Sequence, residues 1–276
     1  MSQEKILFLE IFQPFAQYRN PFTFYYAQSY PLPPKSTIIG MLQNATDKYY
    51  DEQLWNLEVS AHGGFESVFW NYQSLIMGEI ELRKSSERPV PYNQKLPLYG
   101  RGLKSQRYPT SQQELFNGHL YIFIKGEENL IEEIKSSIEL PKKVLSLGRS
   151  EDVIFIKKVE VCELTESFVK KDIWLTYPTY IKSKIKLNEK KFPIRNEKYP
   201  VFSVPVKVVF ENDGKPIKTK GELTKTTERK PEFETVIYTG LNYVVRLSDN
   251  TEIKIEKYKI KDEEKIFKIP KDYGWL

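Results

Sequence analysis

The sequence has a single cysteine, Cys162, and only two histidines, His62 and His119, among its 276 residues. One cysteine excludes an internal disulfide and a multi-cysteine metal site, and no pair of carboxylates is spaced to complete a metal site around a histidine. No apolar run reaches the roughly 18 residues of a membrane helix. We therefore expect no metal, no cofactor and no membrane segment. The absence of a small-residue cleavage site near the start predicts no signal peptide, and the chain is expected to be cytoplasmic.

The charge and the aromatic content permit RNA binding without establishing it. The formal net charge is +5, and the isoelectric point is near 8.9, which is no higher than in many ordinary enzymes. The 18 tyrosines and 16 phenylalanines are more informative, because flat rings can stack on bases, although both residues are also common in strands. Hydrophobic residues at 40% can fill a core, so the chain is expected to fold.

Hydrophobic periodicity predicts an α+β fold. A helix capped by Ser36 or Thr37 is expected after the first strand, and a second helix at residues 127–138 carries apolar residues at helical spacing. Strands are predicted at residues 6–12, 76–83, 120–124 and 153–161. The resulting β-α-β-β-α-β order is that of a ferredoxin-like or RNA-recognition-motif domain, which we assign to residues 1–164.

Residues 165–276 are predicted to form a lysine-rich, β-rich C-terminal lobe. Strands are expected at residues 201–210 and 235–247, with a tight turn at Asn212-Asp213-Gly214 between them.

A long basic insertion separates the second and third predicted strands. It covers residues 84–118, whereas a hairpin loop normally closes in two to five residues, so a functional loop is expected. Between Arg83 and Arg107 there are seven basic residues against one acid. Cations for phosphates with interleaved tyrosines for unpaired bases are what single-stranded RNA needs. The alternative is a solvated loop whose charges only keep it soluble. The cations assigned to RNA are Arg88, Lys95, Arg101, Lys104 and Arg107.

Three short segments carry further binding candidates. Prolines before Lys35, Ser36 and Thr37 stiffen the approach to a helix whose free N–H groups can receive a phosphate, or they simply position a rigid loop. In the second segment, Gly148 permits close approach of a ligand to the backbone and Arg149 with Ser150 can hold a phosphate, although one glycine before a strand is more often a turn. The third segment, Tyr18-Arg19-Asn20-Pro21, holds one of two basic residues among the first 34.

These segments, in this order, resemble the fifth CRISPR-associated (Cas) family of the RAMP superfamily, over about residues 5 to 160. The resemblance implies the subunit that binds and caps the 5′ handle of the guide RNA in a type I Cascade complex, of subtype I-B. It implies one copy per complex, contacts with the backbone Cas subunits and the large subunit, and access to target DNA through the complex. Residues 84–118 would be a thumb that bends the RNA. Residues near the handle would be Arg19, Ser36, Thr37 and Gly148 to Ser150, and we add Tyr18 and Lys35 to this set.

The enzyme alternative is a metal-independent endoribonuclease that processes the guide precursor. In the subtype I-C branch of the same family, cleavage is attributed to a tyrosine near the end of the first helix and a Lys-His pair at the third strand. Tyr49, Tyr50 and His119 stand at similar places here, but Asn117 and Gly118 precede His119, so the lysine is missing. We therefore predict a non-catalytic subunit.

Other sequence features leave little support for competing functions. His62, in Ala61-His62-Gly63-Gly64, reads as a loop residue without a partner. A metabolic enzyme with an acylphosphatase-like core would need a compact acid/base or phosphate motif, which we do not find. A general single-stranded RNA chaperone stays open, and stable association with other Cas subunits would distinguish the two.

Overall fold

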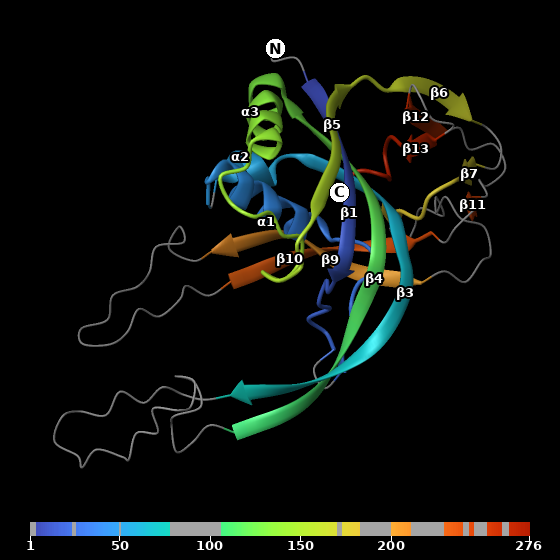
Figure 1. The fold of residues 1–276 in the computed structure, drawn as a ribbon. Helices are drawn as coiled ribbons and strands as arrows, with labels where there is room; N and C mark the ends of the chain where they lie inside the picture. The colour runs from blue at the N-terminus through green and yellow to red at the C-terminus, as the bar shows by residue number, and fades with distance from the viewer. Residues whose placement is uncertain are drawn as a thin grey trace.

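The computed structural model describes residues 4–23, 26–49, 51–77, 106–169, 173–182, 200–210, 229–239, 243–245, 253–260 and 265–276 (Figure 1). Its elements follow in the order β1 (Glu4–Ala16), β2 (Tyr26–Ala27), α1 (Lys35–Thr46), α2 (Glu52–Trp55), β3 (Glu58–Met77), β4 (Gln106–Glu127), α3 (Glu128–Glu139), β5 (Phe155–Cys162), β6 (Thr165–Val169), β7 (Ile173–Leu175), β8 (Tyr180–Lys182), β9 (Val201–Phe210), β10 (Arg229–Tyr238), β11 (Tyr243–Val245), β12 (Ile253–Lys259) and β13 (Ile266–Pro270). The predicted mixed α+β class is confirmed.

The main sheet has the strand order β3-β4-β1-β5, with antiparallel neighbours throughout. The short strand β2 pairs in parallel with β4. Strand β1 is central, as its nearly continuous apolar run predicts, because a strand buried on both faces needs apolar side chains on both. Leu7, Leu9 and Ile11 pack with helices α1 and α3 in one core cluster. Phe8 packs on the other face in a separate aromatic cluster with Phe267.

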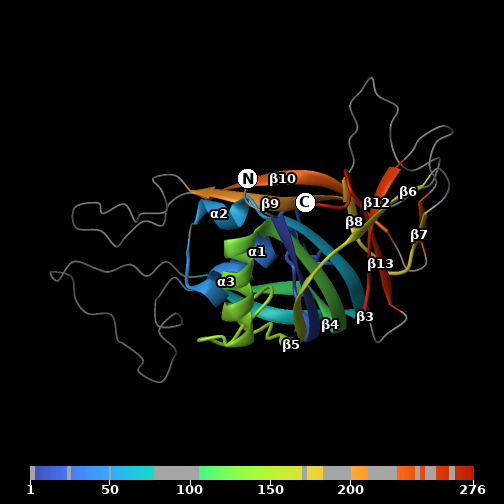
Figure 2. The same ribbon diagram turned by 90° about the horizontal axis from the view of Figure 1, so that it is seen from above.

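The C-terminal strands form three small sheets, β8-β10-β9, β11-β7 and β13-β12-β6. Figure 2 shows α1 lying between the β9–β10 pair and the main sheet, and Val204 and Val236 belong to the same core cluster as the helix. The carboxy-terminal Leu276 exchanges two backbone hydrogen bonds with Val59 at the edge of β3. The core is thus continuous across the expected division at residue 164, and that division stays a prediction.

The two predicted helices are confirmed, but the predicted cap is wrong. Helix α1 begins at Lys35 with Pro34 as its N-cap residue, and no side chain caps it. Thr37 and Ile38 donate their backbone N–H groups to the Pro34 carbonyl instead. Ser36 and Thr37 lie inside the first turn, so neither hydroxyl stands at the position from which a cap can act. None of the helices in the described part of the chain is long and apolar enough to cross a membrane.

The expected basic loop at residues 84–118 is wrong from residue 106 onward. Residues 106–118 belong to strand β4, and the second strand runs from Glu58 rather than from residue 76. Beyond the pair Val68 and Leu115 the two strands leave β1 and continue as a ribbon, with the short β2 pairing at Ser111 and Gln112, and Figure 1 shows this ribbon projecting from the body. The pairing continues to Met77 opposite Gln106. Residues 84–105 and the turn expected at Asn212-Asp213-Gly214 lie outside the described residues.

The Gly63-Gly64 pair, which reads as a loop in the sequence, lies within strand β3. Gly63 has a φ of 114°, and a Cβ there would stand 2.1 Å from the carbonyl oxygen of His119 on the neighbouring strand. Glycine therefore permits close strand approach here. His62 is correspondingly a buried strand residue with partners, and not the loop residue expected. Its Nε2 lies 3.0 Å from the Ser60 hydroxyl, and burial lowers its pKa to about 3.

Candidate nucleic-acid interface

A pocket of about 380 Å³ lies between helix α1, the segment after α3 and strand β9. It brings Ser36 and Thr37 together with Gly148, which stand more than a hundred residues away in the chain. The volume is within the range of small-ligand sites. The residues that line it are Ser36, Thr37, Gly40, Met41, Asn44, Tyr49, Ser146, Gly148 and Val208. We call this site the α1 pocket.

The start of α1 presents the electrostatics of an anion site to this pocket. The helix has no side-chain cap and no acidic residue in its first turn. The helix start carries a partial positive charge, and although Thr37 and Ile38 donate to the Pro34 carbonyl, the N–H groups of Lys35 and Ser36 come too early in the helix for an intrahelical partner. Phosphate groups bind at such helix ends. Ser36 and Thr37 add two hydroxyls at the same place.

Lys35 stands at this helix start among other lysines. It is half-buried, and burial lowers its pKa to about 8, helped by the charges of Lys182 and Lys207 and opposed by that of Glu58. Two remote strands, β8 and β9, contribute these neighbouring lysines. An anion bound nearby would relieve their mutual repulsion, so the surroundings of Lys35 favour a negatively charged ligand.

The opposite wall of the pocket is aromatic and polar. Tyr49 is 51% exposed, so its ring is accessible, and its hydroxyl donates a hydrogen bond to Asn44 Oδ1 at 3.2 Å. Lys143 Nζ lies 5.3 Å from the centre of the Tyr49 ring and 3.3 Å from its hydroxyl. Lys143 is itself paired with Asp47 at 2.5 Å, so the ring rather than the lysine is available to a ligand, and an exposed ring can stack on a base. Sequence reasoning placed Tyr49 only in the catalytic alternative and missed Asn44 and Ser146.

Gly148 is required by the loop that forms the pocket's floor. Its φ is 119°, in the region that favours glycine, and a Cβ there would lie 2.7 Å from a carboxylate oxygen of Asp152. The segment from Gly148 to Asp152 therefore folds back tightly on itself. Its backbone faces the pocket without a side chain at residue 148.

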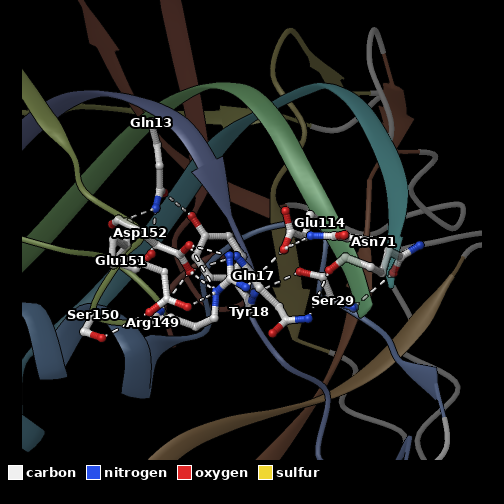
Figure 3. A network of polar contacts seen from close by, with 12 residues as sticks. Gln13, Gln17, Tyr18, Ser29, Asn71, Glu114, Arg149, Ser150, Glu151 and Asp152 are labelled. Carbon is white, nitrogen blue, oxygen red and sulfur yellow. Dashed lines mark hydrogen bonds and ion pairs between the residues drawn. The ribbon is translucent and has the colours of Figure 1, made fainter. Parts of the chain in front are cut away.

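Asp152 is the centre of the polar network drawn in Figure 3. Its buried Oδ2 accepts hydrogen bonds from the backbone N–H groups of Gln17, at 3.0 Å, and Arg149, at 2.9 Å. The side-chain amide of Gln13 donates to the carbonyl oxygens of Leu147, at 2.7 Å, and Asp152, at 3.3 Å. The network ties the loop to the end of β1, so the loop's shape is set by strand β1 as well as by its own glycine.

The predicted phosphate contact of Arg149 is not what the structure displays. Its guanidinium is 2.7 Å from Asp152 Oδ1 and 3.2 Å from Glu114 Oε1, and both carboxylates are buried. Its Nε also lies 3.4 Å from Glu151. The charge of Arg149 is thus already neutralised within the fold, because β4 supplies an acid from far away in the sequence. Ser150, by contrast, is exposed, and its hydroxyl donates to Glu151.

Tyr18 and Arg19, adjacent in the sequence, differ in burial. Tyr18 is buried and donates a hydrogen bond from its hydroxyl to Gln13 Oε1, and burial followed by the charge of Asp152 raises its pKa well above the usual value. Its ring is therefore part of the core, and the prediction that it contacts RNA is wrong for this conformation. Arg19 is exposed, and among the described residues its side chain has no ion-pair partner.

Most of the predicted thumb cations belong to a segment outside the described residues. Arg88, Lys95, Arg101 and Lys104 lie outside the described residues, and Arg107 is a residue of β4 opposite Ile76. Exposed aromatic side chains precede them on the ribbon, where Trp70 meets Tyr26 at 6.2 Å between ring centres and Tyr72 lies close by in β3.

Tyr49 and His119 lie on opposite sides of the main sheet. Tyr49 follows helix α1, which packs on the face formed by Leu120 and Ile122. His119 alternates with Tyr121 on the other face, and its ring contacts Phe12 at 5.3 Å between ring centres. The sheet therefore stands between the two residues that the endoribonuclease alternative needs together. Tyr50 is outside the described residues. In the part of the chain that the structure describes, no group of three or more His, Cys, Asp or Glu side chains could hold a metal.

No curated protein matches the chain. Among solved structures, one described as "CRISPR RNA-guided surveillance complex" is 12% identical, with a TM-score of 0.48, covering 89% of this chain and 94% of that chain. A second, "Crystal structure of a CRISPR protein from Archaeoglobus fulgidus", is 11% identical, with a TM-score of 0.39 and coverages of 96% and 98%. A family model described as "CRISPR-associated protein (Cas_Cas5)" matches residues 6–252. Because that match spans most of the sequence, the chain belongs to this family of CRISPR-associated proteins.

Proposed function

We propose that this protein is a non-catalytic subunit of a CRISPR type I Cascade complex that binds and caps the 5′ handle of the guide RNA. In this role it helps to nucleate the backbone filament for target DNA recognition in antiviral defence. One copy per complex would contact the backbone Cas subunits and the large subunit. Membership of the CRISPR-associated family supports an effector-complex role.

The observation that carries the handle assignment is the α1 pocket. It combines an uncapped helix start, two hydroxyls, a glycine backbone and an exposed tyrosine within one cavity of about 380 Å³. The uncapped helix start can bind a phosphate, and the exposed tyrosine can stack on a base. A cavity that offers both suits a nucleotide better than it suits a purely apolar ligand.

Each wall of the pocket has a distinct task in this proposal. The N–H group of Ser36 and the hydroxyls of Ser36 and Thr37 receive a backbone phosphate, while Gly148 lets the RNA backbone approach the loop closely. The Tyr49 ring stacks on a base of the handle. Arg149 holds the loop in shape through Asp152 and Glu114 rather than contacting phosphate itself.

The arrangement of the first 164 residues supports a ferredoxin-like domain. Strands β1, β3, β4 and β5 with helices α1 and α3 follow the β-α-β-β-α-β order, and α1 and α3 pack on one face of the sheet. The ribbon of β3 and β4 supports a projecting thumb, because the two strands stay paired as far as Met77 opposite Gln106, beyond the last residues of β4 that pair with β1.

The handle assignment is tested by exchanging Tyr49 in the full chain. Tyr49→Ala should weaken binding of the cognate handle RNA about tenfold, because one stacked base is lost. Tyr49→Phe keeps the ring and should stay within about threefold of wild type. Trp174→Ala is the matched control, since Trp174 is 59% exposed but lies on β7, away from the pocket. Equal affinities for wild type and Tyr49→Ala would remove the pocket from the proposal.

A further inference from the structure

The face of the main sheet opposite helices α1 and α3 is only partly covered. At one end, Phe8, Tyr121 and Phe123 pack beneath the C-terminal strands in an aromatic cluster. Phe267 of β13 contacts all three of these rings, at 4.9 to 5.9 Å between ring centres. This end of the face is therefore sealed by the protein itself.

The other end of the same face carries an accessible group of rings. Phe12 of β1 lies 5.3 Å from His119 of β4 and 6.2 Å from Phe155 of β5, between ring centres. His119 is exposed and Phe155 is 53% exposed, so both rings are free for contact. We call Phe12, His119, Phe155 and the adjacent Lys157 the stacking platform.

The charges around the stacking platform favour an anionic ligand. Lys157 Nζ lies 5.7 Å above the Phe12 ring, and it makes no ion pair with any described residue. The nearest acids along β1 and β5 are each neutralised, Glu10 by Lys265 at 3.3 Å and Glu160 by Lys158 at 3.0 Å. Proteins bind a nucleic-acid strand with cations that contact its phosphates and rings that stack on its bases. The unpaired Lys157 beside three adjacent rings provides both kinds of group.

We propose that the stacking platform binds unpaired bases of single-stranded RNA at a second site, on the sheet face opposite the α1 pocket. Bases stack on the Phe12, His119 and Phe155 rings, and Lys157 contacts a phosphate. Rings on the open face of a four-stranded sheet bind two or three RNA bases in this way. Here the C-terminal lobe restricts the site to one end of the sheet. The proposal does not require that the α1 pocket binds the handle.

The test measures the affinity of the full chain for a labelled oligouridylate of about ten nucleotides, a length that fits one single-strand site. Phe155→Leu keeps an apolar side chain but removes the ring, and it should weaken binding about tenfold. Phe155→Tyr keeps the ring, so its affinity should stay within about twofold of wild type. Phe168→Leu is the matched control, because Phe168 is 66% exposed and has Lys254 5.8 Å from its ring centre, but no other aromatic ring of the described residues contacts it.

The outcomes separate this site from the α1 pocket and from other partners. Wild-type affinity in Phe155→Leu would overturn the proposal, even if the handle RNA still requires Tyr49. Equal weakening in Phe168→Leu would overturn it as well, since loss of any exposed phenylalanine would then have the same effect. The same assay is run with an oligodeoxyuridylate of equal length. If the chain bound this DNA more tightly than the oligouridylate, RNA would be rejected as the ligand. Photo-crosslinking of a 5-iodouridine oligonucleotide to the peptide that contains Phe155 would support it, and crosslinks confined to other peptides would contradict it.

Discussion

The two basic segments beside the α1 pocket use their charges in opposite ways. Arg149 in the loop is bound by Asp152 and Glu114, so its charge serves the fold. Lys35 at the helix start faces Lys182 and Lys207, and its charge is left partly uncompensated. Residue type alone does not reveal this difference. A cation in a sequence motif is available to a ligand only when no carboxylate of the fold forms an ion pair with it.

The largest expected effect comes from breaking the network on the loop side. Asp152→Ala removes one partner of a buried ion pair and leaves two backbone N–H groups without an acceptor, so it should lower the free energy of unfolding by about 3–5 kcal/mol. Urea unfolding of the full chain measures this change. Glu151→Ala is the neighbouring control, and because Glu151 is exposed it should change stability by less than about 0.5 kcal/mol. Equal losses for both variants would mean that the network is not structural.

A pair of glycine substitutions compares the two walls of the pocket. Gly148→Ala places a Cβ at a φ of 119° against the Asp152 carboxylate and should destabilise by about 1–3 kcal/mol. Gly40→Ala, inside α1 with no atom within 4 Å of the added Cβ, should stabilise by up to about 1 kcal/mol. Thermal unfolding of both variants distinguishes them. A stable Gly148→Ala protein would show that the loop can relax away from the strained geometry.

The charge of Lys35 should give a pH dependence to RNA binding. Its pKa of about 8 is below the ordinary value of 10.5, so RNA affinity should fall as pH rises through about 8, while folding stability rises between about 8 and 10.5 because the unfolded state then binds more protons. Affinity measured from about pH 7 to about pH 9 tests this. Lys35→Arg, which stays charged, should flatten the profile. An unchanged profile in Lys35→Arg would assign the titration to another group.

The smallest expected effect concerns cleavage. Because His119 and Tyr49 lie on opposite sides of the sheet, His119→Ala should leave guide processing unchanged when cleavage products are followed on a gel. Loss of a cleavage activity of the purified chain in this variant would make the protein a processing endoribonuclease.

Local patterns predicted the helices and the central strand, and they failed where distant strands decide the structure. The apolar spacing of Leu130, Ile131, Ile134 and Ile138 defines α3, and all four are buried. The parts of β3 before residue 76 and of β4 before residue 120 were missed, because the stretch with Gly63 and Gly64 reads as a loop until His119 is placed opposite. The register between two paired strands cannot be predicted from the sequence of either strand alone.

The candidate site was also predictable only where local sequence patterns define it. Ser36, Thr37 and Gly148 were expected near one ligand, and the structure brings them into one pocket. Thr37, Gly40 and Asn44 share a helix face at spacings of three and four, a signal that could have added Asn44. The ion pair between Arg149 and Glu114 joins β4 to a loop 35 residues later, and no local pattern indicates it.

The most direct measurement compares the wild-type chain's affinity for its cognate repeat RNA with its affinity for an RNA of equal length whose 5′ handle is scrambled, without divalent metal. The proposed function predicts binding of the cognate handle at least about tenfold tighter, a difference that one or two base contacts supply, with the RNA remaining intact. Equal affinity for the two RNAs would contradict handle recognition, and cleavage of the cognate RNA would contradict the non-catalytic role.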